Sequence, residues 1–108
     1  MSSGCAELAD WNNTVLDLVA ALRGVISPNM RMIVLSHDGT RWRFLFVLEH
    51  DDPTDREEIE DVPSEFEALQ SGPVDCAADV QIANGPLPWP AHPARVIYRR
   101  RERSGDSG

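Results

Sequence analysis

Apolar residues recur along the chain with two different periods, and each period predicts one type of element. In the first segment they recur at steps of three and four, with polar residues between them, at Leu8, Trp11, Val15, Leu18 and Leu22. This spacing places them on one face of an amphipathic helix. Gly24 provides a left-handed cap and Ser27-Pro28-Asn29 a turn, so we expect the helix to end near Arg23.

A long antiparallel hairpin is predicted next. Met30 to His37 is rich in long and branched apolar residues, and Thr40 to Glu49 has large apolar residues at alternate positions, namely Trp42, Phe44, Phe46 and Leu48. Asp38-Gly39 lies between the two runs, and both residue types tolerate the positive φ of a tight hairpin turn.

A second helical region follows the hairpin. Thr54 stands three residues before Glu57, which is the spacing of a capping box at a helix start. Pro63 has no backbone N–H to donate and its ring clashes with the preceding turn, so we expect Asp55 to Gln70 to form two short helical pieces rather than one straight rod. The expected buried face consists of Ile59, Val62, Phe66 and Leu69.

Two more strands are predicted in the last third of the chain. Val74 to Ile82 has the period of two that is typical of a half-buried strand, and a last strand is expected from Ala94 to about Arg101. The link between them holds four of the eight prolines. We therefore expect a stiff, extended loop that packs through Leu87 and Trp89.

The order of elements, α-β-β-α-β-β, predicts an α+β fold. We expect a two-layer sandwich in which an antiparallel sheet of about four strands carries the helices on one face, with the strand order left open. A chain of 108 residues fits one domain, since domains cluster at roughly 100 to 150 residues. The domain is expected to span residues 1–103, and a disordered tail is expected at residues 104–108.

Negative charge is concentrated in one stretch of the chain. Ten of the nineteen residues from Glu49 to Glu67 are acidic, Arg56 is the only base among them, and the whole chain has a net charge of −8. A pI of about 4.7 argues against general binding to nucleic acids or anionic membranes, because both need clustered positive charge. The expected partner is therefore basic.

This acidic stretch has two interpretations. It is either a solvated helix face whose first acids favour the helix dipole, or a binding surface. The second is favoured, because like charges spread over a strand end, a loop and a helical region destabilise a fold unless a partner benefits. The predicted binding residues are Glu49, Asp51, Asp52, Asp55, Glu57, Glu58, Glu60 and Asp61. Glu65 and Glu67 are left out, because a helix break at Pro63 would point them elsewhere.

No catalytic residue, metal site or cofactor site is predicted. The histidines fall in no arrangement that is typical of catalysis: they are His37, His50 and His92. The segment Asp51–Asp55 contains Pro53 and no glycine, so it does not match a calcium-binding loop. Cys5 and Cys76 lack the spacing of metal ligands and are expected to be reduced thiols.

The basic run Tyr98-Arg99-Arg100-Arg101-Glu102-Arg103 also has two interpretations. A basic tail can contact nucleic acid. Arginines at a strand end can instead pair with carboxylates of the same protein, and this second interpretation is favoured. The expected carboxylate partners are the acidic stretch, or Asp75 and Asp79.

Three segments together resemble a known family. They are Gly24-Val25-Ile26-Ser27-Pro28-Asn29-Met30-Arg31 before the hairpin, the acidic block from Asp55 to Glu67 with its E-E-x-E-D pattern, and the last strand Val96-Ile97-Tyr98-Arg99-Arg100-Arg101-Glu102. In this order they resemble the immunity proteins of bacterial contact-dependent growth inhibition systems.

The resemblance implies an inhibitor rather than an enzyme. Such a protein stays in the cytoplasm of the producing cell, and the absence of a recognisable export signal or membrane span in the sequence leads to the same expectation. It would bind, as a monomer, the C-terminal toxin domain of a delivered effector. Many such toxins are nucleases, often acting on transfer RNA, and an acidic surface can occupy a basic groove by imitating the polyanion. Trp42 and Trp89 are candidate interface anchors, although core or loop packing is the preferred explanation for both.

Two other classes of function stay open. One is a small acidic regulatory or accessory domain without a toxin partner, which would form a homodimer through an exposed patch on Trp42, Phe44 or Phe46. The other is a small hydrolase, for which turnover would have to depend on a histidine or an aspartate.

Overall fold

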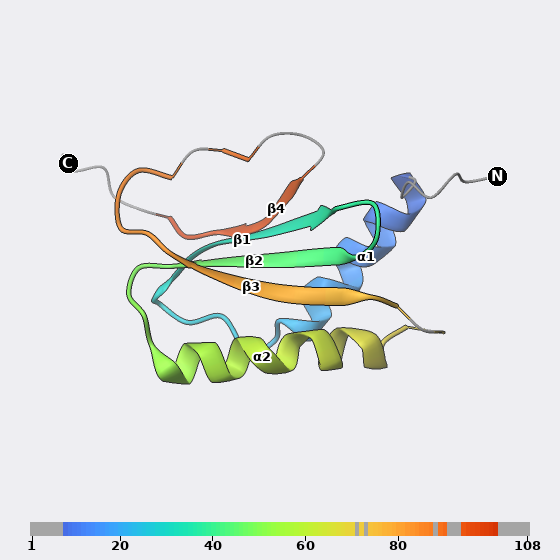
Figure 1. The fold of residues 1–108 in the computed structure, drawn as a ribbon, viewed down its shortest axis with the longest axis horizontal. Helices are drawn as coiled ribbons and strands as arrows, with labels where there is room; N and C mark the ends of the chain where they lie inside the picture. Colours follow the sequence, from blue (N-terminus) through green and yellow to red (C-terminus); the bar gives the residue numbers. More distant parts are fainter. Residues whose placement is uncertain (1–7, 71, 73, 88, 91–93, 102–108) are drawn as a thin grey trace.

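The computed structural model describes residues 8–70, 72, 74–87, 89–90 and 94–101, with side chains from Trp11 onwards. The elements are α1 (Leu8–Ala21), β1 (Met30–His37), β2 (Trp42–Leu48), α2 (Pro53–Ala68), β3 (Cys76–Ile82) and β4 (Arg95–Arg99), shown in Figure 1. The α+β class and the order of elements are therefore confirmed. The predicted tail at residues 104–108, Cys5 and His92 lie outside the described residues.

The four strands form one mixed sheet in the order β3-β2-β1-β4. β1 pairs antiparallel with both β2 and β4, which confirms the hairpin. β2 pairs with β3 in parallel, so the prediction of an antiparallel sheet was wrong for this pair. The physical reason is α2, because a helix between two strands returns the chain to the starting edge and lets the second strand run parallel to the first.

The turn of the β1–β2 hairpin differs slightly from the prediction. Gly39 has a φ of 92°, but Asp38 is not among the residues with positive φ. The prediction of a tight two-residue turn at Asp38-Gly39 was therefore wrong. His37 pairs with Trp42 across the hairpin, and the Asp38 carboxylate accepts backbone N–H groups from Thr40 and Arg41 at 2.9 Å each. The Asp38 carboxylate therefore stabilises a turn that is longer than two residues.

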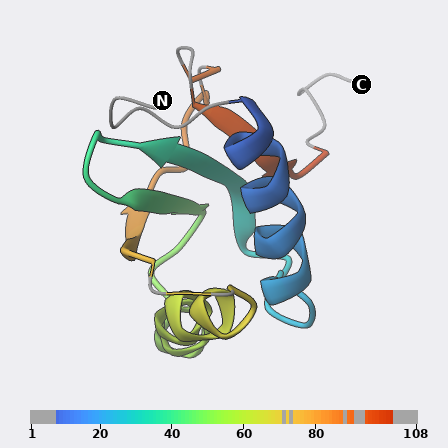
Figure 2. The same ribbon diagram turned by 90° about the vertical axis from the view of Figure 1, so that its right-hand side faces the viewer.

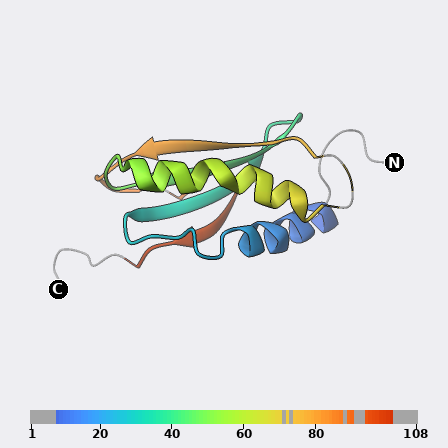
Figure 3. The ribbon, with the colours of Figure 1, turned by 90° about the horizontal axis from the view of Figure 1, so that it is seen from below.

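Both helices share one hydrophobic core with alternate residues of β1 and β2. The fully buried residues of this core include Leu18 from α1, Ile33, Leu35, Phe44 and Phe46 from the strands, and Val62 and Phe66 from α2. In Figure 3, which views the fold from below, α2 lies in front of the β2–β3 side of the sheet and α1 beside β4, and Figure 2 shows α2 nearly end on below the sheet. The two-layer description stays a prediction.

The second apolar cluster contains Met32, Val34 and Val47 from the same central strands. Leu87 and Ala94 pack against it, so the proline-rich link does pack through Leu87 as predicted. Trp89 does not pack in the same way: it is 68% exposed, and its ring lies 5.0 Å from the guanidinium of Arg99.

α2 is one continuous helix, and the expected break at Pro63 was wrong. Proline in a helix interior costs about 3 kcal/mol. Burial of one large apolar side chain contributes about 1.5–3 kcal/mol, and Ile59, Val62 and Phe66 on the same helix are all buried. Packing thus outweighs the proline. Leu69, which was expected to be buried, is the C-cap residue and is 49% exposed.

Candidate functional site

The start of α2 is fixed by Asp52 and Pro53. The Asp52 carboxylate accepts the backbone N–H of Thr54 at 2.8 Å and that of Asp55 at 3.1 Å, so Asp52 is the N-cap. The capping box on Thr54 was therefore wrong. An aspartate followed by proline combines a preferred N-cap with a residue whose φ suits the first helical position.

A single asparagine ties the start of α2 to the rest of the fold. The side-chain amide of Asn29 donates to the His50 carbonyl at 2.8 Å and to the Asp55 carboxylate at 2.9 Å. Its side-chain oxygen accepts the His50 N–H at 2.8 Å. Asp55 is only 7% exposed, so this hydrogen bond partly compensates for the burial of its charge.

Half of the predicted binding residues have partners within the protein. Asp52 caps the helix and Asp55 binds Asn29, as described above. Glu49 forms an ion pair with Arg100 at 2.9 Å, and Asp51 forms one with Arg56. The structure thus places four predicted residues in internal contacts, of which those of Asp51, Asp52 and Asp55 involve the start of α2.

The other half of the predicted set lies together on the outside of α2. These are Glu57, Glu58, Glu60 and Asp61, and all four are exposed. Within the part of the chain that the structure describes, no hydrogen bond or ion pair involves their side chains. Since α2 continues through Pro63, Glu65 is exposed on the same helix, although it was not among the predicted binding residues. We call these five residues the α2 acidic face: Glu57, Glu58, Glu60, Asp61 and Glu65.

Helix stability does not explain the α2 acidic face. Glu57 and Asp61, and Asp61 and Glu65, are like charges four residues apart, an arrangement that destabilises a helix. Glu65 and Glu67 lie in the last turn, where the helix dipole disfavours negative charge, and that turn has no base. Helix energetics alone therefore does not account for these acids.

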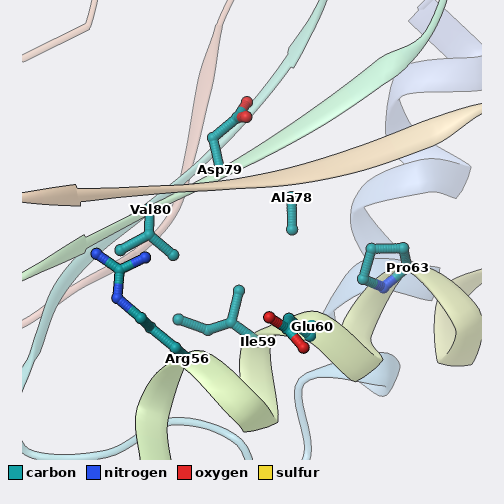
Figure 4. A pocket seen from close by; sticks show the side chains of 7 residues that line it. All are labelled: Arg56, Ile59, Glu60, Pro63, Ala78, Asp79 and Val80. Carbon is teal, nitrogen blue, oxygen red and sulfur yellow. The ribbon is translucent and has the colours of Figure 1, made fainter. Parts of the chain in front are cut away.

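A groove with a volume of about 350 Å³ adjoins the α2 acidic face (Figure 4). It lies between α2 and the edge strand β3. Its lining residues are Arg56, Ile59, Glu60 and Pro63 from the helix and Ala78, Asp79 and Val80 from the strand. The groove was not predicted from the sequence, because it forms only where β3 lies beside α2 at the edge of the sheet.

The basic residues are distributed differently from the prediction. Arg41 pairs with Asp75 at 3.5 Å, and Arg43 pairs with both Asp38 and Asp79 at 2.9 Å. The carboxylates of Asp75 and Asp79 are thus paired with Arg41 before β2 and Arg43 in β2, and the predicted pairing of these two carboxylates with the C-terminal arginine run was wrong. The prediction is confirmed only for the acidic stretch, through the ion pair between Arg100 and Glu49.

The aromatic anchor candidates lie away from the α2 acidic face. Trp42 is 8% exposed and packs edge-on against Trp11, with ring centroids 5.0 Å apart. Phe44 and Phe46 are fully buried in the same core. The apolar patch that motivated the homodimer interpretation is therefore inside the protein. Trp89 is exposed but contacts Arg99 of β4, on the opposite edge of the sheet from β3.

The titratable groups of the described residues show no arrangement for metal chemistry. No group of three or more His, Cys, Asp or Glu in that part of the chain is close enough to hold a metal ion. Burial, and then the negative charge of Glu67, raise the pKa of the Cys76 thiol to about 11, which makes it a poor nucleophile. The His37 ring accepts the Gly39 N–H at 3.0 Å and supports the hairpin turn.

Comparison with known proteins identifies a family. Residues 12–102 match the model of the family described as MafI2 immunity protein. A search of curated proteins gave no match. Neither described helix is long and apolar enough to cross a membrane.

Proposed function

Because the chain belongs to the MafI2 immunity protein family, we propose that it binds and neutralises a cognate toxin domain through the α2 acidic face. The partner is the C-terminal toxin domain of a delivered effector of the contact-dependent growth inhibition type. That domain is a basic nuclease that acts on RNA, with transfer RNA as its substrate class. The protein works as an inhibitor in the cytoplasm of the producing cell, as one half of a heterodimer.

The observation that carries this proposal is the unpartnered charge of α2. The five acids of the α2 acidic face form no ion pair with the described residues, and three of them, Glu57, Asp61 and Glu65, repel one another at spacings of four residues. A nuclease presents a basic groove for phosphates, and a dense acidic surface meets it with complementary potential. The internal contacts of Asp52 and Asp55 fix the start of the helix, so the acids are carried by a preformed helix.

The test uses the toxin fragment encoded immediately upstream. Wild-type protein is expected to bind it tightly, with affinity that falls as salt is added. Replacement of Glu57, Glu58, Glu60 and Asp61 by Ser is expected to weaken binding by at least about tenfold, in keeping with the loss of several charges from one interface. The single substitutions Glu57→Ser and Asp75→Ser form a matched pair, because Asp75 already has Arg41 as its partner and should matter less. Absence of binding at micromolar concentration contradicts the proposal.

A second candidate function is a homodimeric accessory domain. The observation that favours it is an exposed apolar surface on α1, which differs from the surface predicted from the sequence. Leu16 and Val19 on α1 are 67% and 50% exposed, and Ile26 beside them is 43% exposed. Val19 and Ile26 line a groove with Ile97 and Tyr98 of β4. Light scattering after size exclusion separates the two candidates: a stable dimer that Leu16→Ser disrupts supports this one, and a monomer removes its motive.

A further inference from the structure

The groove between α2 and β3 is open at the edge of the sheet. β3 is the last strand in the order β3-β2-β1-β4. The Asp75 carbonyl and the Ala83 N–H bond to β2, so by alternation the backbone groups of Ala78 and Val80 point away from β2. A partner side chain can therefore enter the groove from the β3 edge without displacing a strand.

The groove combines apolar side chains from both elements with charged ones, and one of its carboxylates has no partner among the described residues. Ala78 and Val80 point toward α2 in Figure 4, whereas Asp79 points away from it, and Ile59 forms a buried floor. The charged side chains of the lining are thus Arg56 and Glu60. Arg56 is held by Asp51, and the described residues supply no partner for Glu60.

Apolar side chains beside a carboxylate that has no internal partner fit an arginine side chain. The methylene stem packs on apolar surface, while the guanidinium fork binds a carboxylate with two parallel hydrogen bonds. An acidic side chain is disfavoured, because Glu57 and Asp61 add negative charge on the same helix as Glu60. Arginine is also enriched among the side chains that carry most of the binding energy of protein interfaces.

We propose that this groove receives an arginine of the toxin domain, with Glu60 as its carboxylate partner and Ile59, Pro63, Ala78 and Val80 as the apolar lining. This inference rests on the proposed function, and it assigns different kinetic roles to the groove and to the rest of the α2 acidic face. The rest of the α2 acidic face accelerates encounter by long-range attraction, whereas the groove slows dissociation because its contacts are made only in the docked complex.

The experiment compares two acids of the same helix. Glu60→Gln and Glu65→Gln remove the same charge from exposed positions of α2, but only Glu60 lines the groove. Association and dissociation rates are measured by surface plasmon resonance against the toxin fragment encoded upstream. Both substitutions are expected to lower the association rate by a similar small factor. Only Glu60→Gln is expected to raise the dissociation rate, by about tenfold or more.

A second pair tests the apolar part of the groove without a change in charge. Ala78→Leu fills the groove from β3, whereas Ala77→Leu places the same side chain on the opposite face of that strand. Thermal unfolding confirms that both variants are folded. Faster dissociation for Ala78→Leu alone supports the proposal.

The outcomes are distinguishable. Equal dissociation rates for Glu60→Gln and Glu65→Gln overturn the arginine groove and leave the acidic surface standing. Absence of wild-type binding overturns the proposed function, and the groove proposal with it. If Ala78→Leu does not fold, the dissociation rates of Glu60→Gln and Glu65→Gln still test the proposal.

Discussion

Asp61 has the most like-charged neighbours on the α2 acidic face, and its neutralisation should stabilise the free protein. Glu57 precedes it by four residues, Glu58 by three, and Glu65 follows by four, which are the spacings at which helix side chains interact. Each like-charge pair costs about 0.2–0.5 kcal/mol, so Asp61→Asn should add about 1 kcal/mol to the free energy of unfolding. Asp and Asn have similar helix propensities, so the substitution changes little else.

The assay is urea denaturation of the free protein at low ionic strength, followed by circular dichroism. We expect a higher midpoint with an unchanged slope, and a melting temperature raised by about 5 °C. In 1 M NaCl the gain should largely vanish, because the Debye length falls to about 3 Å. The same substitution should slow association with the toxin domain, so stability and binding change in opposite directions.

An unchanged or lower stability of Asp61→Asn at low salt would refute this reasoning. It would mean that the acids of α2 do not repel one another appreciably, and that a solvated helix face is a sufficient explanation of them. A gain that persists in 1 M NaCl would also contradict it, since the cause would then not be electrostatic.

Three further predictions follow from the contacts around α2. Asn29→Ala should destabilise the protein by about 3 kcal/mol in urea denaturation, because it leaves a buried carboxylate unsatisfied; a loss below about 1 kcal/mol would contradict that role. Asp52→Ala should cost about 1 kcal/mol and Thr54→Ala much less, and the reverse order would restore the capping box. In a Cys5→Ser background, Cys76 should react with iodoacetamide at pH 8 about a hundredfold more slowly than in the unfolded protein, because burial raises its thiol pKa to about 11; equal rates would contradict its placement.

The local pattern of the sequence was sufficient for the elements and their order. Apolar spacing predicted the first helix, β2 and β3, because burial on one face imposes the period of each element, whereas the second helix was predicted from a proposed cap at Thr54. It did not reveal that β3 pairs in parallel with β2, since a strand's own period carries no information about its neighbour. The helix between these strands was the available signal, because such a connection is typical of a parallel crossover.

The errors around α2 have identifiable physical causes. Local rules placed a break at Pro63 and a capping box at Thr54, and tertiary packing and Asp52 overrode them. The charge count could not separate acids with internal partners, such as Asp55, from exposed acids such as Glu60, because that separation depends on Asn29 and other residues distant in sequence. The groove beside Glu60 could not be predicted either, because part of its lining comes from β3, whose position beside α2 was not predicted.

The most direct test of the account is an NMR titration of ¹⁵N-labelled protein with the unlabelled toxin domain encoded upstream. The account predicts that the largest backbone shift changes cluster on Glu57 to Asp61 of α2 and on Ala78 to Val80 of β3. Shift changes confined to β4 and the region of Trp89, with α2 unaffected, would contradict it.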